Sequence, residues 1–251
     1  MIDKKLTQDF MFLKEKGYDV VGLFLYGSQN YSLATDESDV DSKAIVLTPR
    51  EDLILRKNPI SLTLESPTGG QIDVKEITTM NNMFMKQNIN FLEILFTDYY
   101  IIDNHYDYLV TELRNHRERI AKANPIKTLN SIIGMQKAKQ SRLFKRVEST
   151  AKDYDKYGYS AKDLHHIVRL NEFVTRYING ESYKDCLVSK MPEYLISIKK
   201  GRFDVDKVNM MAEASISQTE DMVKEYANKH NCNVDEGISE LLDKIAISAY
   251  Y

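Results

Sequence analysis

Apolar and polar positions follow two different spacings along this chain. Up to about residue 103, apolar residues gather in short runs that end at glycine, proline or polar residues. From His105 onwards they recur every three to four residues over long stretches. Short bounded runs are typical of β-strands, and the second spacing is typical of amphipathic helices. The pattern predicts an α+β protein with two domains, residues 1–103 and residues 104–251.

The N-terminal domain is expected to be a small, mostly antiparallel mixed β-sheet with flanking helices. A first helix is predicted over residues 1–17, and Gly17 suits its end. Thr78 or Thr79 is a candidate cap for the next helical stretch. The predicted strands are Val20–Tyr26, Ala44–Leu47, Ile60–Glu65 and Gln71–Ile77, and the later helices are Met80–Asn88 and Ile89–Phe96.

The C-terminal domain is predicted to be helical. Pro125 suits the first turn of a helix, and Asn124 suits its cap. Gly158, Gly180 and Gly201 fall where helices are expected to end. The predicted helices are His105–Ala121, Pro125–Tyr157, Ala161–Asn179, Asp204–His230 and Val234–Ser248.

Composition narrows the class of protein. The 251 residues are 43% hydrophobic and 28% charged, so a sizeable core is expected and wholesale disorder is not. The net charge of −3 argues against a chain coated for non-specific nucleic-acid binding, although it leaves room for a local basic patch. Cys186 and Cys232 lie far apart without metal-ligand spacing, as in a reduced cytoplasmic protein. Neither a signal segment nor a membrane-spanning run occurs, which predicts a soluble protein without a membrane partner.

Two aspartates stand at the start of the second predicted strand. Asp39 and Asp41 are two residues apart, so on a strand their carboxylates leave from the same face. The first strand ends at Gly27 and Ser28, and it is expected to pair with the second. Carboxylates opposite a glycine-serine turn predict a site for Mg²⁺ and phosphate, because Mg²⁺ prefers carboxylate and phosphate oxygens.

A third acid lies on a later strand. Asp73 stands between Ile72 and Val74, which is the pattern of a half-buried strand. If that strand lies beside the one that begins near Asp41, Asp73 joins the same metal site. Glu76 is the competing acid, but on a regular strand it points to the opposite face. Three carboxylates around two metal ions would clamp the attacking and leaving oxygens of an in-line phosphoryl displacement.

The order of these residues resembles the signature of a known superfamily. Gly27-Ser28 precedes Asp39-Val40-Asp41, and Ile72-Asp73-Val74 follows on a separate strand. This arrangement resembles the DNA polymerase β-like nucleotidyltransferases. The fuller string is similar to one branch, the RNA-repair-associated nucleotidyltransferases of phages and bacteria, and reads LYGSQNYSLATDESDVDSKAIVL. The resemblance extends from about residue 20 to about residue 210 through Asn90–Phe96, Lys162–Leu170 and Ile198–Gly201.

The resemblance implies an enzyme that transfers a nucleoside monophosphate from an NTP to an acceptor hydroxyl and releases pyrophosphate. It implies that the Gly27 backbone and Ser28 hold the β- and γ-phosphates. Asp39, Asp41 and Asp73 would bind two Mg²⁺ ions, with Mn²⁺ as an alternative, and Asp73 would also activate the acceptor. The helical domain would close the nucleotide cleft, with an RNA or tRNA end as the favoured acceptor.

Two features of the helical domain have competing interpretations. The resemblance implies that Arg169 approaches the nucleotide. A basic run at helical spacing is either a solvated face or a lane for a triphosphate or nucleic-acid strand, and it comprises Lys137, Lys139, Arg142, Lys145 and Arg146. Adjacent helical positions point about 100° apart, so His165 and His166 are not expected to share a metal ion.

Other functions stay open at the level of sequence. The acceptor can be a small molecule or a protein side chain, as in other members of the superfamily. A catalytically silent nucleotide sensor would bind NTP without releasing pyrophosphate. An RNA-binding module without chemistry would bind with a steep salt dependence and ignore Mg²⁺.

Overall fold

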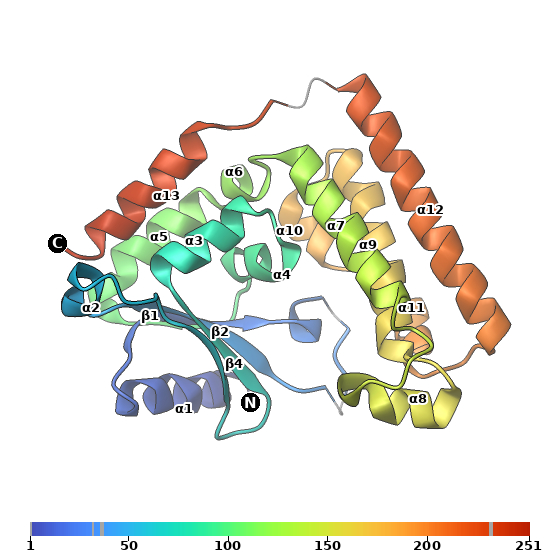
Figure 1. Ribbon diagram of the computed structural model, residues 1–251, viewed down its shortest axis with the longest axis horizontal. Coiled ribbons are helices and arrows are strands. Elements are labelled where there is room, and N and C mark those ends of the chain that lie inside the picture. Colours follow the sequence, from blue (N-terminus) through green and yellow to red (C-terminus); the bar gives the residue numbers. More distant parts are fainter. Residues whose placement is uncertain (1, 32, 36–37, 231–232) are drawn as a thin grey trace. The chain divides into compact units, whose positions relative to one another are not determined.

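The protein is described by a computed structural model at residues 2–31, 33–35, 38–230 and 233–251. Cys232 therefore lies outside the described residues. The chain forms two compact units (Figure 1). Unit 1 comprises residues 1–30, 34–123 and 234–251, and unit 2 comprises residues 31–33 and 124–233. The chain thus leaves unit 1 after Ala123, not near residue 103, and returns to it at the C-terminal end.

Unit 1 is built on a five-stranded sheet with the order β3-β4-β2-β1-β5. Among the described strands only β2 and β4 run parallel, so the expected mixed, mostly antiparallel sheet is confirmed. The sequence pattern does not predict β5, because a run of three residues is too short to separate from a loop. The strands are β1 (Asp19–Tyr26), β2 (Asp41–Leu47), β3 (Ser61–Glu65), β4 (Gln71–Glu76) and β5 (Tyr100–Ile102).

Helices cover both faces of this sheet (Figure 1). On one face α1 (Ile2–Glu15) packs Leu6 and Leu13 onto a fully buried cluster of strand residues that includes Leu23, Val46 and Val74. Helices α3 (Ile77–Met85) and α5 (Asp107–Asn115) contact the strands from the other side. The shorter elements of unit 1 are η1 (Ser28–Tyr31), α2 (Arg50–Ile54), α4 (Ile89–Leu92), η2 (Glu93–Leu95), η3 (Asn104–Tyr106) and α6 (Arg117–Ala121).

Glu76 links β4 to both the next helix and the C-terminal end. Its carboxylate accepts hydrogen bonds from the backbone N–H groups of Thr78 and Thr79, at 2.8 and 3.1 Å, so Glu76 and neither threonine caps α3. It also accepts from the Tyr250 hydroxyl at 3.3 Å. Tyr250 follows α13 (Gly237–Ser248), which packs on α3 and α5. Glu76 therefore has a structural role, away from the face that carries Asp73.

Unit 2 is organised around α9 (Ala161–Ile178), which is buried along most of its length. It packs against α7 (Pro125–Gln140), α8 (Ala151–Tyr157), α10 (Tyr183–Leu187), α11 (Pro192–Lys199) and α12 (Val205–Lys229). Asn124 caps α7 by accepting a hydrogen bond from the Lys127 N–H at 2.9 Å, as predicted. Among the described helices, none is both long and apolar enough to cross a membrane.

The predicted helix over Pro125–Tyr157 is wrong, because α7 ends at Gln140 and α8 begins at Ala151, after the short η4 (Glu148–Thr150). Tertiary contacts explain the break. The Leu143 carbonyl accepts from the Ser160 N–H at 2.8 Å, and the Arg142 guanidinium binds Asp163 in α9. The chain turns at this point to reach α9, whereas its helical residue pattern continues.

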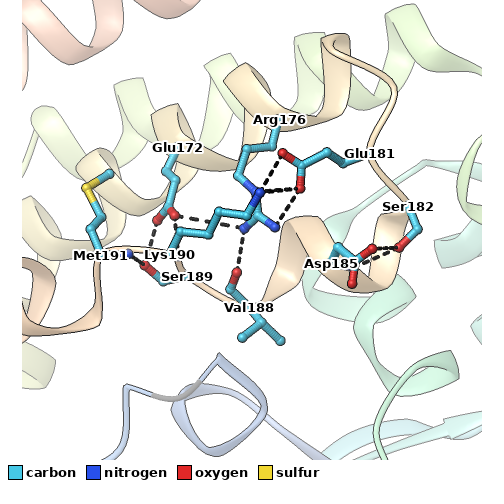
Figure 2. A network of polar contacts seen from close by, with 9 residues as sticks. All are labelled: Glu172, Arg176, Glu181, Ser182, Asp185, Val188, Ser189, Lys190 and Met191. Carbon is cyan, nitrogen blue, oxygen red and sulfur yellow. Dashed lines mark hydrogen bonds and ion pairs between the residues drawn. The ribbon is translucent and has the colours of Figure 1, made fainter.

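A second polar network fixes the loops after α9 (Figure 2). The Arg176 guanidinium donates to the Glu181 carboxylate at 2.8 Å and to the Val188 carbonyl. Four residues before Arg176, Glu172 accepts from the Ser189 hydroxyl at 2.7 Å. These bonds join side chains of α9 to residues on both sides of α10, and they hold two short helices, α10 and α11, that the sequence pattern does not reveal.

Candidate active site

The sheet face opposite α1 carries two of the three acids predicted for the site, Asp41 and Asp73. Tyr26 of β1 lies opposite Asp41 of β2, and Lys43 of β2 lies opposite Asp73 of β4. Residues that face each other across neighbouring strands project from the same side of a sheet. Asp41 and Asp73 therefore share one face. Asp73 lies opposite Lys43, two residues further along β2 than Asp41. The strand of Asp73 lies beside the strand of Asp41, as the sequence analysis required.

Asp73 is bracketed by two lysines. Lys43 Nζ lies 3.0 Å from one carboxylate oxygen, and Lys75 Nζ lies 2.8 Å from the other. The contact to Lys75 is an ion pair without hydrogen-bond geometry, so that buried oxygen, Oδ1, accepts no hydrogen bond from a described residue. The Asp73 side chain is 14% exposed. Each oxygen of this carboxylate therefore faces one ammonium group, and only Oδ2 accepts a hydrogen bond from a described residue.

Lys43 is itself held in a closed environment. Its side chain is 5% exposed, and its ammonium group lies 3.9 Å from the Tyr26 ring centroid and 4.3 Å from that of Phe91. Two aromatic faces and one carboxylate compensate the loss of water around this cation. Sequence reasoning missed Lys43, although a signal was present: Lys43 stands two residues after Asp41, so the strand alternation puts it on the same face.

Asp41 contacts the hairpin between β3 and β4. Its carboxylate accepts a hydrogen bond from the Gln71 N–H at 2.9 Å. The close approach depends on Gly70, where φ is +82° and an added Cβ would lie 2.7 Å from the Val40 carbonyl oxygen. Asp39 precedes β2 and is exposed. One predicted acid is therefore anchored and another is open to solvent.

The Gly27-Ser28 turn ends β1 beside the same acids. Gly27 has φ +91°, and a Cβ added there would meet nothing within 4 Å, so open space adjoins its backbone. Its N–H donates to the carboxylate of Glu93 at 3.1 Å, and Glu93 is only 1% exposed. Ser28 is half-buried at the start of η1. No local signal identifies Glu93 as the anchor of this turn, because the two residues meet only in the folded chain.

The Tyr26 hydroxyl is affected by the charges of three acids of unit 1. Burial raises the pKa of the Tyr26 hydroxyl, and the charges of Asp41, Asp73 and Glu93 raise it further. On the same sheet face, the ammonium group of Lys43 lies over the Tyr26 ring.

The donor set suits a hard divalent cation in its chemistry, since Asp41 and Asp73 present carboxylate oxygens on one face. Among the described residues, however, no three His, Cys, Asp or Glu side chains form a ready metal cluster. Asp73 faces two ammonium groups instead. The described residues thus supply two carboxylates on one face, and the assignment of Asp39, Asp41 and Asp73 as Mg²⁺ ligands stays a prediction.

Arg169 in unit 2 is a buried cation for which the described residues supply no counter-ion. It is 4% exposed, and its guanidinium carbon lies 3.8 Å from the ring centroid of Tyr31, which belongs to the same unit. Its Nε is buried and donates no hydrogen bond to a described residue. A buried charge is unfavourable unless it is paired, so this guanidinium is suited to receive an anion.

The basic run of α7 is largely neutralised within unit 2. Lys137 pairs with Glu220 at 2.5 Å, and Arg146 pairs with Asp155 at 2.8 Å. Lys139 and Arg142 both contact Asp163, at 3.2 and 2.8 Å. These contacts favour a structural role for most of the run over a lane for phosphates, and a contact between Lys137 and the nucleotide stays a prediction.

The two adjacent histidines of α9 lie edge to face with ring centroids 5.6 Å apart. His165 Nδ1 lies 3.0 Å from the Leu195 carbonyl oxygen. Burial lowers the pKa of His165 to about 4, and burial also holds the pKa of His166 well below its usual range. Both imidazoles are therefore neutral near pH 7, and His165 links α9 to α11.

Comparison with known proteins contributes little beyond this geometry. No family model and no curated protein matches the chain. The solved structures that match include a nucleotidyltransferase-like protein from Exiguobacterium sibiricum, which is 12% identical to this chain. The similarity covers 97% of this chain and 88% of that one, with a TM-score of 0.32. A likeness at this level does not assign a function.

Proposed function

We propose that this protein is a magnesium-dependent nucleotidyltransferase that moves a nucleoside monophosphate from an NTP to an acceptor hydroxyl. The observation that carries the proposal is the strand register. It brings Asp41 and Asp73 to one sheet face, next to a glycine-serine turn with open space beside its backbone. The spacing of these residues along the sequence, which resembles the DNA polymerase β-like signature, supports the same conclusion.

Each residue has a defined task in the proposed reaction. The Gly27 backbone and Ser28 hold the β- and γ-phosphates, while Asp39, Asp41 and Asp73 are the metal ligands. The acceptor oxygen attacks the α-phosphorus, the bond from that phosphorus to the bridging oxygen breaks, and pyrophosphate leaves. Asp73 receives the proton of the acceptor hydroxyl. A bound pair of Mg²⁺ ions supplies charge neutralisation for the phosphates and acidifies that hydroxyl.

Arg169 is the proposed anion contact of the helical unit. Its burial without a counter-ion among the described residues supports this role independently of the sequence resemblance. An RNA or tRNA end is the favoured acceptor, on the resemblance to the RNA-repair branch, with a small molecule or a protein side chain as the alternative.

One observation favours a second candidate, a nucleotide-binding sensor without catalysis. The two lysines on Asp73 neutralise the carboxylate that the transfer reaction needs as metal ligand and base. If this pairing persists when NTP binds, the protein binds nucleotide without releasing pyrophosphate.

Incubation with each α-phosphate-labelled NTP, Mg²⁺ and a cell extract tests the proposal. The expected result is Mg²⁺-dependent transfer of label to an extract component, with release of pyrophosphate. Asp41→Asn should remove both signals. Asp3→Asn, the same change at an exposed position of α1, should preserve them. Transfer retained in Asp41→Asn would refute the assignment, and NTP binding without pyrophosphate release would identify the sensor.

A further inference from the structure

A small surface cavity lies at the β5 edge of the unit 1 sheet. Its volume is about 190 Å³, and its lining includes Tyr100, Arg114 and Arg117. Thr111 and Asn115 add a hydroxyl and an amide group to the wall. Pockets for whole small molecules are usually larger, roughly 300–1,000 Å³, so this cavity suits one group of a larger ligand.

The two arginines of this cavity make no ion pair with a described carboxylate. Arg114 donates to the Thr97 carbonyl at 2.9 Å, and its guanidinium carbon lies 4.4 Å from the Tyr100 ring centroid. The guanidinium of Arg117 lies 5.9 Å from the Phe96 ring centroid. Within the described chain, neither arginine has a carboxylate at ion-pair distance. Two like charges one turn apart repel unless an anion lies between them.

The pKa of Arg114 reflects the same situation. Burial lowers it, and the positive charge of Arg117 lowers it further, whereas the neighbouring Tyr100 and Asp98 act in the opposite direction. Asp107 also lines the cavity and opposes an anion there. The cavity lining itself thus carries two guanidinium groups and one carboxylate, and Asp98 lies near enough to act on Arg114.

The cavity shares a sheet face with Asp73. Tyr100 lies opposite Phe24, Phe24 opposite Lys43, and Lys43 opposite Asp73, so these four residues form one row across the sheet. Ile101, between Tyr100 and Ile102, packs on the other face with the core under α1. With strands about 4.8 Å apart, three spacings separate Tyr100 from Asp73, or roughly 14 Å.

From this placement we infer that the Arg114/Arg117 cavity binds a backbone phosphate of a polynucleotide acceptor. The inference rests on the proposed function and names the acceptor class. An NTP that reacts at Asp73 keeps its α-phosphate there, so a phosphate in this cavity belongs to another part of the substrates. A polynucleotide carries such a group on every residue, and guanidinium groups bind it bidentately. The net charge of the whole chain is negative, so the affinity for a strand has to come from local sites of this kind.

Binding of a fluorescein-labelled, short single-stranded oligoribonucleotide, measured by anisotropy at several salt concentrations, tests the inference. Arg117→Ala should weaken binding roughly 5- to 10-fold and reduce the slope of log K against log salt by about 0.7, the value for one lost contact. Asp107→Asn should strengthen binding about twofold, since it removes the opposing charge. Arg50→Ala, an exposed arginine of α2 in the same unit, should change it less than twofold.

Equal affinities for Arg117→Ala and Arg50→Ala would overturn the inference. A second result would also overturn it. If inorganic phosphate binds in an Arg117-dependent way but the affinity for the oligoribonucleotide does not depend on Arg117, the cavity holds free phosphate only. Melting temperature and NTP binding, expected to be unchanged in each variant, exclude misfolding as the cause. The binding measurements need no catalysis, so a failure of nucleotidyl transfer and a failure of this cavity are distinguishable.

Discussion

Asp73 in unit 1 and Asp163 in unit 2 are both aspartates with two cationic neighbours, yet their oxygens are used differently. The Asp163 side chain is fully buried, and Arg142 donates to both of its oxygens at 2.8 Å. Lys139 adds a third contact at 3.2 Å. Asp73 is partly exposed, and each of its oxygens faces one lysine.

The difference separates a carboxylate held by a guanidinium fork from one held by two ammonium groups. A guanidinium fork occupies both oxygens in a fixed geometry, whereas an ammonium group is a point charge that can shift to a neighbouring acceptor. Burial alone would raise the pKa of Asp163, but the hydrogen bonds from Arg142 and the charge of Lys139 outweigh it and lower that pKa. Asp163 locks α7 to α9, and Asp73 keeps one oxygen without a hydrogen bond.

The same substitution at both positions gives the largest contrast. Asp163→Asn should reduce the free energy of unfolding by about 3 kcal/mol, because Arg142 and Lys139 lose their counter-ion. Asp73→Asn should reduce it by less and should lower nucleotidyl transfer at least roughly 1,000-fold. Urea unfolding and the labelled-NTP assay measure the two effects. A larger loss of stability in Asp73→Asn would contradict the distinction.

Two arginines of α9 extend the comparison to cations. Arg176 is paired with Glu181 (Figure 2), whereas Arg169 has no counter-ion among the described residues. Arg176→Met should lower the free energy of unfolding by about 3 kcal/mol. Arg169→Met should leave it equal or raise it by about 1 kcal/mol, because an unpaired buried charge is removed. The same variant should weaken NTP binding at least roughly fivefold by calorimetry; unchanged NTP affinity would remove Arg169 from the proposed site.

Lys43→Met tests whether Lys43 competes with Mg²⁺ for the Asp73 carboxylate. The variant leaves that carboxylate with Lys75 alone, so its affinity for Mg²⁺ should increase a few-fold while stability without metal falls by about 1–2 kcal/mol. The shift of the melting temperature with Mg²⁺ concentration measures both quantities, with Lys139→Met as the matched change beside Asp163. A Mg²⁺ response equal to that of the unmodified protein would show that Lys43 does not compete with the ion.

The smallest expected effect is the contribution of His165 to the pH dependence of stability. Its pKa is lowered to about 4 by burial, so the folded protein binds fewer protons than the unfolded chain between about pH 6.5 and pH 4. The stability associated with the neutral imidazole is complete above pH 6.5 and is lost as the pH falls through this window. His165→Asn keeps a donor for the Leu195 carbonyl and should lose less melting temperature between pH 7 and pH 5. An identical pH dependence in both proteins would contradict the assignment.

Much of the fold and part of the site follow from the sequence by itself. Four of the five strands of the sheet, the central helix of unit 2 and the Asn124 cap are predictable, because alternation, helical periodicity and capping depend on residues close together in the chain. The same local rule puts Asp41 and Lys43 on one strand face. It also sets Asp73 apart from Glu76, which caps α3.

Which groups meet depends on contacts between segments that lie far apart in the chain. The register of β2 and β4 brings Lys43 to Asp73, and folding brings Glu93 to the Gly27 N–H. The break after Gln140 and the return of α13 to unit 1 likewise depend on contacts between distant segments. Such pairings follow from the packing of whole elements, since the partners stand far apart in sequence and no local preference selects them.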